Sequence, residues 1–187
     1  ANVSQNEVGS NKNTYRRELE EEAKLTNYAV TEELGELVVT KSTAEIIITA
    51  GSQSRPYNGS ALTNGNYSYT EDVLAKGDVL TATVEGGITD VGSAANKVTG
   101  YKVMRGDKDV TAWYTFGESV DGKLEVTRRP VTIQTEGGTK EYDGTALTNA
   151  QVKVSVGSFV EGELKSLKAT GSQTEVGSSK NTYSLEL

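Results

Sequence analysis

The chain has 187 residues, with 19 Lys and Arg against 26 Asp and Glu, which gives a formal net charge of −7 at pH 7. It contains no Cys and no His, and this excludes nucleophilic systems and metal sites that need a thiolate or an imidazole. The acidic balance argues against a nucleic-acid partner, and no apolar run is long enough for membrane insertion. We therefore expect no enzyme activity and no cofactor.

The sequence repeats itself at a spacing of about 85 residues. Residues 57–64 recur as 142–149 at a shift of 85, with six of eight positions identical. Residues 35–41 recur as 122–128, and Val-Gly-Ser occurs three times, beginning at Val8, Val91 and Val176. Three independent markers at one period indicate tandem copies of a small module.

The markers predict where each copy begins and ends. A cut after the Val-Thr-Lys/Arg strand gives a C-terminal portion of a repeat (1–41), a complete module (42–128) and an N-terminal portion of a repeat (129–187). Each end portion is too small to bury a sheet face alone. The ends should therefore meet in a neighbouring molecule, or the module boundary lies near Val-Gly-Ser instead.

The first element along the chain has conflicting signals. Residues 15–25 have high helical propensity, but their counterpart, residues 101–110, has the pattern of a strand, a Gly turn and a second strand. We give the repeat more weight and place the acidic side chains of residues 18–22 on a solvated hairpin tip. A cation site there is a weaker alternative, because the acidic residues lack the spacing of a calcium loop.

The remaining segments are predicted to be strands with one solvent-exposed face. Apolar and polar residues alternate through 80–84, 124–126, 131–133 and 152–156, and Gly-containing turns separate these runs. Short strands at such spacing indicate an all-β fold of small tandem modules, each an immunoglobulin-like sandwich or a β-grasp-like sheet, in an elongated array.

Aromatic residues give the main candidates for core and contact positions. Tyr28 and Tyr114 correspond between copies and are expected to form a core pair, which places Trp113 outward on its strand as the favoured contact residue. Partial burial of Trp113 at a module junction is the alternative. Tyr57 and Tyr142 are expected to tuck against the module body, each with its hydroxyl bonded to backbone.

Further candidate ligand-contact residues lie at variable tips. Arg105-Gly106-Asp107 spells an integrin-recognition tripeptide, although a plain Gly turn accounts for so short a motif. The other candidates lie in segments that depart from the repeat pattern; they are Arg16 and Arg17 in the first copy and Arg55 and Tyr57 of Arg55-Pro56-Tyr57 in the second.

Several motifs together resemble a known repeat type. They are Val131 to Ile133, Tyr142 to Asn149, Gly171 to Gly177, Asp109 to Tyr114 and Gly122 to Arg128. In combination they are similar to the tandem β-rich YDG or MBG-type repeats of Gram-positive bacterial surface adhesins. The resemblance implies an extracellular segment, attached to the cell wall through regions outside these residues, in contact with neighbouring repeats.

Three functions follow as hypotheses. The leading one is a non-enzymatic stalk that projects or presents a ligand-binding surface. The second is direct binding of a host extracellular protein or glycan, such as an immunoglobulin or a mucin glycoprotein, through edge strands or hairpin tips. The third is a carbohydrate-active domain, which needs two carboxylates facing each other in a pocket.

Overall fold

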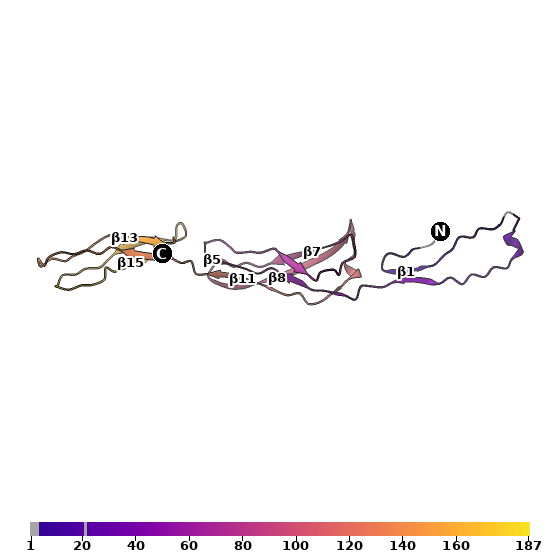
Figure 1. Cartoon of the computed structure of the whole chain (residues 1–187), viewed down its shortest axis with the longest axis horizontal. Coiled ribbons are helices and arrows are strands. Elements are labelled where there is room, and N and C mark those ends of the chain that lie inside the picture. The colour runs from indigo at the N-terminus through magenta and orange to yellow at the C-terminus, as the bar shows by residue number, and fades with distance from the viewer. Residues whose placement is uncertain (1–3, 21) are drawn as a thin grey trace. The chain divides into compact units, whose positions relative to one another are not determined.

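A computed structural model describes residues 4–20 and 22–187 of the chain (Figure 1). The described residues form strands, turns and loops, with no α-helix and two short 3₁₀ helices, η1 (Leu25–Asn27) and η2 (Thr111–Trp113). This confirms the predicted all-β fold of small modules. None of the described helices is long and apolar enough to cross a membrane.

The strands are short, apart from β7 and β8. They are β1 (Gly9–Lys12), β2 (Glu36–Val39), β3 (Glu45–Ile46), β4 (Ile48–Ala50), β5 (Gln53–Pro56), β6 (Tyr67–Tyr69), β7 (Asp78–Glu85), β8 (Gly92–Arg105), β9 (Lys108–Asp109), β10 (Thr115–Phe116), β11 (Gly122–Thr127), β12 (Thr132–Thr135), β13 (Val152–Val156), β14 (Ser166–Ala169) and β15 (Tyr183–Glu186). The strands predicted from alternation coincide with parts of β7, β11, β12 and β13.

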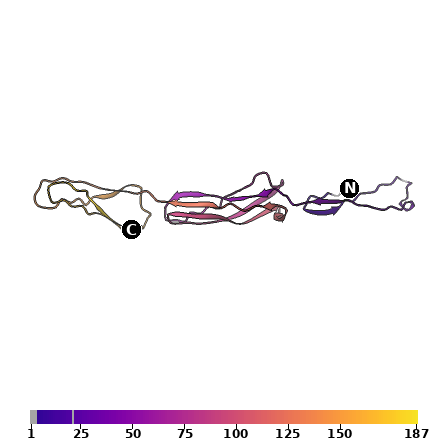
Figure 2. The same ribbon diagram turned by 90° about the horizontal axis from the view of Figure 1, so that it is seen from below.

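By its internal contacts the chain divides into two units, and β7 and β8 contribute residues to both. Unit 1 comprises Ala1–Ala50, Asn66–Val84 and Val98–Val120. Within it β1 pairs antiparallel with β2, β3 pairs parallel with β10, β4 pairs antiparallel with β6, and β8 pairs antiparallel with β9. The two strands of the β1–β2 pair lie side by side (Figure 2).

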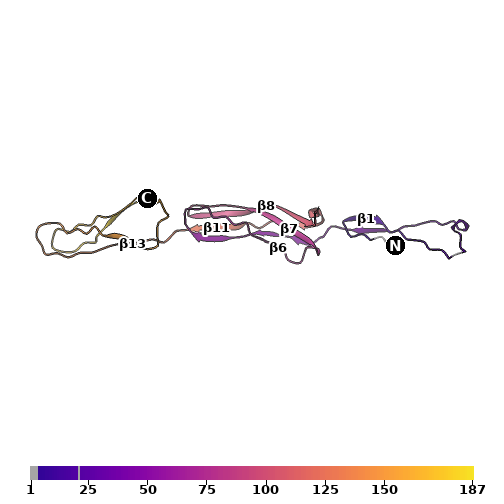
Figure 3. The same ribbon diagram turned by 90° about the horizontal axis from the view of Figure 1, so that it is seen from above.

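Unit 2 comprises Gly51–Gly65, Glu85–Lys97 and Asp121–Leu187. Its most extensive pairing places β11 between β5, to which it is parallel, and β8, to which it is antiparallel. β11 and β8 are seen next to each other in Figure 3. Two further antiparallel pairs, β12–β13 and β14–β15, complete the unit.

Each unit has its own cluster of buried apolar side chains. In unit 1 the buried members are Ile46, Ile48, Leu80, Val103, Val110 and Tyr114. In unit 2 Leu124 and Val126 of β11 pack with Leu62, flanked by the partly buried Tyr57 and Ile88. All of the buried hydrophobic residues among those described lie between residues 46 and 126.

The acidic run near the N-terminus lies on the long connection between β1 and β2. Glu18 and Glu20 have irregular backbone and Glu22 lies in a turn, whereas Glu21 falls outside the described residues. Because β1 and β2 are antiparallel, the run is in the loop of a hairpin, as predicted. Among the described residues of this loop, the helix that local propensity favoured does not form, and neither do the strands that flank the turn in its counterpart.

Candidate functional site

Trp113, the favoured contact residue, lies on the 3₁₀ helix η2 and not on a strand. Its side chain is partly buried against the core of unit 1. The charged groups of Arg105 and Lys108 lie 5.2 and 4.8 Å from its ring centroid, within cation–π range. The prediction that Trp113 faces outward is therefore wrong, because a helical turn breaks the two-residue alternation on which it depended. Partial burial, the alternative, is what the structure has.

Arg105 forms an ion pair with a buried carboxylate. Its Nε and Nη2 donate to the two oxygens of Asp78 at 2.6 and 3.0 Å, and the Asp78 side chain has no exposed surface. Tyr114 donates its hydroxyl to Asp78 Oδ2 at 2.5 Å and accepts the Ala75 N–H at 3.0 Å. The Arg105 guanidinium holds the pKa of Asp78 below its ordinary value, and the Tyr114 hydroxyl acts in the same direction, against the effect of burial.

The Arg105-Gly106-Asp107 tripeptide occupies a hairpin tip, as predicted. Arg105 and Lys108 pair across the β8–β9 ladder, and Gly106 has a φ of 58°, which suits glycine in a tight turn. Asp107 is exposed, but the guanidinium of Arg105 is directed at Asp78. The two charged residues of the motif are therefore not presented together to a partner.

Tyr57 and Arg55 make intramolecular contacts at the end of β5. Tyr57 packs beside the unit 2 core and donates its hydroxyl to the carboxylate of Glu163, which raises the pKa of Tyr57. The tucked ring agrees with the prediction, whereas the expected bond to backbone is wrong. Arg55 donates from Nη2 to the Ser60 carbonyl at 2.7 Å, within the adjoining turn.

Arg16 and Arg17 lie on the long loop between β1 and β2. Arg16 is exposed and approaches Glu18 at 3.7 Å. Arg17 pairs with Glu32 and donates from Nε to the Tyr15 hydroxyl at 3.1 Å. The loop does not bring either arginine to the other predicted contact residues.

The expected pairing of Tyr28 with Tyr114 as core residues is half right. Tyr114 is 5% exposed, whereas Tyr28 is 65% exposed. Each follows a 3₁₀ helix at the same point of the repeat, so local structure is equal and the difference lies in packing. Tyr114 is covered by the chain around Ala75 and Asp78, and no described segment covers Tyr28 in that way. Tyr142 is likewise exposed, which corrects its predicted tucked position.

Asn96, which was not singled out from the sequence, joins three segments of unit 2. Its side chain is fully buried, and its Nδ2 donates to the carbonyls of Gly51 and Asn64 at 2.8 and 2.7 Å. Gly86 lies against it, since a methyl group added at Gly86 would lie 2.6 Å from Asn96 Oδ1. We call this arrangement the asparagine clasp.

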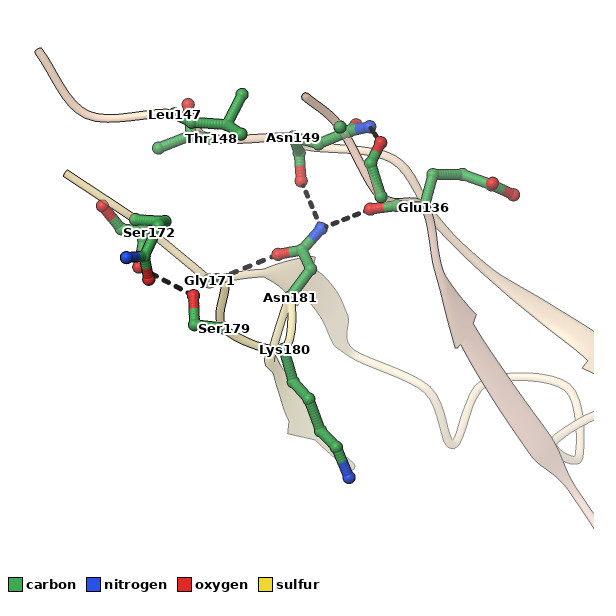
Figure 4. Close-up of a pocket in the computed structure, with 12 residues that line it drawn as sticks. Glu136, Leu147, Thr148, Asn149, Gly171, Ser172, Ser179, Lys180 and Asn181 are labelled. Carbon is green, nitrogen blue, oxygen red and sulfur yellow. Dashed lines mark hydrogen bonds between the residues drawn. The ribbon is translucent and has the colours of Figure 1, made fainter. Parts of the chain in front are cut away.

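The same clasp is built a second time around Asn181 (Figure 4). Asn181 Nδ2 donates to the carbonyls of Glu136 and Asn149 at 2.9 and 2.8 Å, and Oδ1 accepts the Gly171 N–H at 3.1 Å. Each of these four residues lies 85 positions after its counterpart in the first clasp. A signal for it was present in the sequence, because all three Val-Gly-Ser segments continue to Asn after two further residues, at Asn13, Asn96 and Asn181.

Comparisons of the chain with protein-family models, curated proteins and solved structures find no match.

An open groove runs along residues 138–149 and 171–181 of unit 2, beginning at the second clasp. One section, with a volume of about 110 Å³, is lined by the residues around Asn181, and the second, of about 340 Å³, extends to Tyr142 and Gly177. Leu147 and Gln173 line both sections. Figure 4 shows the Asn181 amide directed toward Asn149 and Glu136, with the Lys180 side chain directed away from them.

The groove is lined chiefly by small, polar and backbone groups. Among the described residues no group of three or more acidic side chains is placed to hold a metal ion. Across one end, Lys140 forms an ion pair with Asp143 at 2.7 Å and lowers the pKa of that carboxyl.

Proposed function

We propose that the chain is a structural spacer in the repeat region of a bacterial surface adhesin, located outside the cell and attached to the wall through other regions. Its modules hold a fixed arrangement with their neighbours, and they do no chemistry. The direct partners are adjoining repeats, and a host protein or glycan is bound elsewhere in the adhesin.

The observation that carries this proposal is a set of specific contacts where residues 42–128 meet residues 129–187. Arg129, just before Pro130, donates to the Ser158 carbonyl at 2.6 Å and to Ser158 Oγ at 2.7 Å. It also donates to the Tyr57 carbonyl at 3.4 Å, and the Tyr57 hydroxyl bonds to Glu163. We call this set the Arg129 junction. A flexible linker between independent domains has no need of such contacts.

Glycine at position 59 is part of the same junction. Gly59 has a φ of +80°, and a methyl group added there would lie 2.9 Å from Val160 Cγ1. The turn at Asn58-Gly59 thus approaches the loop at Val160 as closely as a residue without a side chain allows. Close packing of this kind favours one arrangement of the two segments over many.

Contacts around Trp113, where residues 42–128 meet residues of the first repeat portion, also support the proposal. Lys108, which lies over the Trp113 ring, also binds the carboxylate of Glu7 at 2.5 Å. Ser42, at the start of the module, donates its N–H to the Trp113 carbonyl at 2.9 Å and accepts the Thr115 hydroxyl at 2.7 Å. Trp113, Arg105, Tyr57 and Arg55 are therefore engaged in contacts within the chain, whereas Asp107 and Arg16 are exposed. The contacts of the first four favour the spacer over direct host binding.

Replacing Arg129 with Ala should open the Arg129 junction. The loss of its three hydrogen bonds is expected to raise the rate of trypsin cleavage after Arg128 roughly three- to tenfold, because cleavage requires local opening. The bond after Arg129 precedes proline and is not a trypsin site. Lys123→Ala, which removes an exposed pair with Glu125 on β11, is the matched control and should leave that rate unchanged. An Arg129→Ala chain cut at the wild-type rate would show that the junction is not held by this residue.

The proposed location is tested on cells. Antibodies raised against this chain should label intact cells of the organism that encodes it, without permeabilisation. Labelling that appears only after permeabilisation would contradict a surface spacer, whatever the behaviour of the junction.

A further inference from the structure

Two equivalent turns of unit 2 have the same Asx bond but differ in the residue that makes it. Asn58 Oδ1 accepts the Ser60 N–H at 3.0 Å. At the same point of the next copy, 85 positions later, Asp143 Oδ1 accepts the Thr145 N–H at 2.9 Å. Each is followed by a glycine with a left-handed φ, of 80° and 76° respectively. One form of turn thus holds an amide in one copy and a carboxylate in the other.

The cation beside this turn has a carboxylate partner in only one of the two copies. In the later copy Lys140 pairs with Asp143 at 2.7 Å. Its counterpart Arg55 donates from Nη2 to the Ser60 carbonyl at 2.7 Å, so its guanidinium lies at the turn that contains Asn58. Arg55 Nε is buried, and none of the described residues accepts its hydrogen. The earlier copy therefore has the cation and the turn, with an amide where the later copy has the carboxylate.

Asn58 is placed for the reaction that produces such a carboxylate. In an Asn-Gly sequence the backbone nitrogen of glycine can attack the asparagine Cγ, because glycine has no side chain to obstruct the approach. The Asx bond folds the Asn58 carboxamide back over the Gly59 peptide, which is the side from which attack comes. The Ser60 N–H donates to Oδ1, the atom on which negative charge develops during attack.

The nucleophile and the leaving group at this turn are both unencumbered. Among the described residues, no group accepts the Gly59 N–H and none is hydrogen-bonded to Asn58 Nδ2. Asn58 is also exposed, so water reaches the site. The geometry thus provides an oriented nucleophile, a donor to the developing oxyanion and a leaving nitrogen that nothing retains.

We infer that Asn58-Gly59 is a self-modification site, at which Asn58 loses ammonia in the folded chain and becomes a carboxylate partner for Arg55. The Gly59 nitrogen forms a bond to Asn58 Cγ and gives up its proton, while the Cγ–Nδ2 bond breaks and the nitrogen leaves with that proton as ammonia. Water then opens the cyclic imide at one of its two carbonyls, which yields aspartate or isoaspartate. The reaction changes the chain itself and acts on no other molecule, so it goes beyond the proposed spacer role and does not depend on it.

The chain contains a second Asn-Gly pair, Asn64-Gly65, that the fold protects. Asn64 is partly buried, and its Nδ2 donates to the Ser52 carbonyl at 3.3 Å. Its own carbonyl, which belongs to the same peptide group as the Gly65 nitrogen, accepts Asn96 Nδ2 at 2.7 Å in the asparagine clasp. Both the leaving nitrogen and the attacking peptide group are therefore held. The two pairs share a sequence motif and differ in structure, so Asn64 is the internal control for Asn58.

The rates of ammonia loss at these two pairs test the inference. The full chain is incubated at mildly alkaline pH, either folded or unfolded in guanidinium chloride, and peptide mass spectrometry with fragment ions follows each amide. In the folded chain Asn58 should react roughly tenfold faster than Asn64, whereas in the unfolded chain the two rates should agree within about twofold. Asn58 should also react no more slowly in the folded chain than in the unfolded one. Equal rates in the folded chain, or an Asn58 rate that folding lowers, would overturn the inference.

A second measurement tests whether the product carboxylate pairs with Arg55. Asn58→Asp supplies the aspartate product directly, and it should stabilise the chain only while Arg55 is present. In a double-mutant cycle with Arg55→Gln at neutral pH, the coupling should correspond to roughly a two- to fivefold change in the unfolding equilibrium constant. The same cycle at Lys140 and Asp143 is the matched control and should give coupling in the same range. Absence of coupling at Arg55 would overturn the pairing, whatever the rate of ammonia loss.

Discussion

Replacing Asp78 with Ala should lower the free energy of unfolding by about 2–4 kcal/mol at neutral pH, because it breaks a buried ion pair from its buried side. The Asp78 carboxylate accepts from Arg105 and Tyr114 and has no exposed surface, so the guanidinium and the hydroxyl lose their partner together. The expected loss in free energy of unfolding is smaller than for a fully buried ion pair, since about a third (35%) of the Arg105 side chain is exposed to solvent. Chemical denaturation measures the change.

The same site should contribute to loss of stability in acid. The pKa of Asp78 is lowered in the folded chain, so its contribution is complete above the unfolded value of about 3.9. It is lost as pH falls from there through the folded pKa, and Asp78→Ala should lack this component of the acid dependence. Asp143→Ala is the control, because its carboxyl is also held by a cation, Lys140, but is exposed. Equal effects of the two substitutions would argue against a role for burial.

Replacing Asn96 with Ala should destabilise the chain by about 2–3 kcal/mol, since it removes a fully buried side chain, withdraws two donors from the carbonyls of Gly51 and Asn64, and leaves a cavity. Asn181→Ala offers a comparison, because it removes the two equivalent bonds, and the one that Oδ1 accepts from Gly171, where the side chain is only partly buried. Water can reach that clasp, so the expected cost is about 1 kcal/mol. Thermal unfolding of the two variants side by side measures the difference, and an equal loss would mean that burial does not set the strength of the clasp.

Glycine variants beside the clasp provide an independent check. A methyl group at Gly86 would lie 2.7 Å from the Ala95 carbonyl oxygen, as well as against Asn96, and backbone must shift to admit it. At the neighbouring Gly87 the nearest atom, Thr63 Cγ2, is 3.7 Å away. Gly86→Ala should therefore destabilise the chain, and Gly87→Ala should be nearly neutral.

Most of the strands could be predicted from the sequence, because the alternation of apolar and polar residues is a local signal. Alternation through residues 80–84 and 152–156 requires only that one sheet face be wetter than the other. At residues 15–25 the repeat correctly argued against a helix, since the counterpart at 101–110 has a Gly turn at its centre. The strands that flank this turn in the counterpart do not form among the described residues of 15–25, so the repeat predicted the hairpin loop there but not its strands.

Orientation and burial were harder to predict, because they depend on segments that pack from elsewhere. Trp113 follows Val110 through a turn of 3₁₀ helix, so the two-residue alternation of a strand predicted the wrong orientation for the Trp113 side chain. Tyr28 and Tyr114 have equivalent local structure, yet only Tyr114 is covered by another segment of the chain. The asparagine of the clasp was visible in the sequence as a recurring Asn. The residue type alone does not tell whether its side-chain amide is buried or exposed.

The parallel pairing of β5 with β11 has a consequence for how the chain responds to force. β5 is reached from the N-terminal side and β11 leads to the C-terminal side, and in a parallel pair these two ends point in opposite directions. Tension applied along the chain therefore slides the two strands past each other, so that their cross-strand bonds are strained all together. An antiparallel hairpin pulled from its open end would instead break its bonds in succession, at a lower load. The sheet of residues 42–128 thus contains a pair of strands that is loaded in shear when the chain is pulled from its two ends.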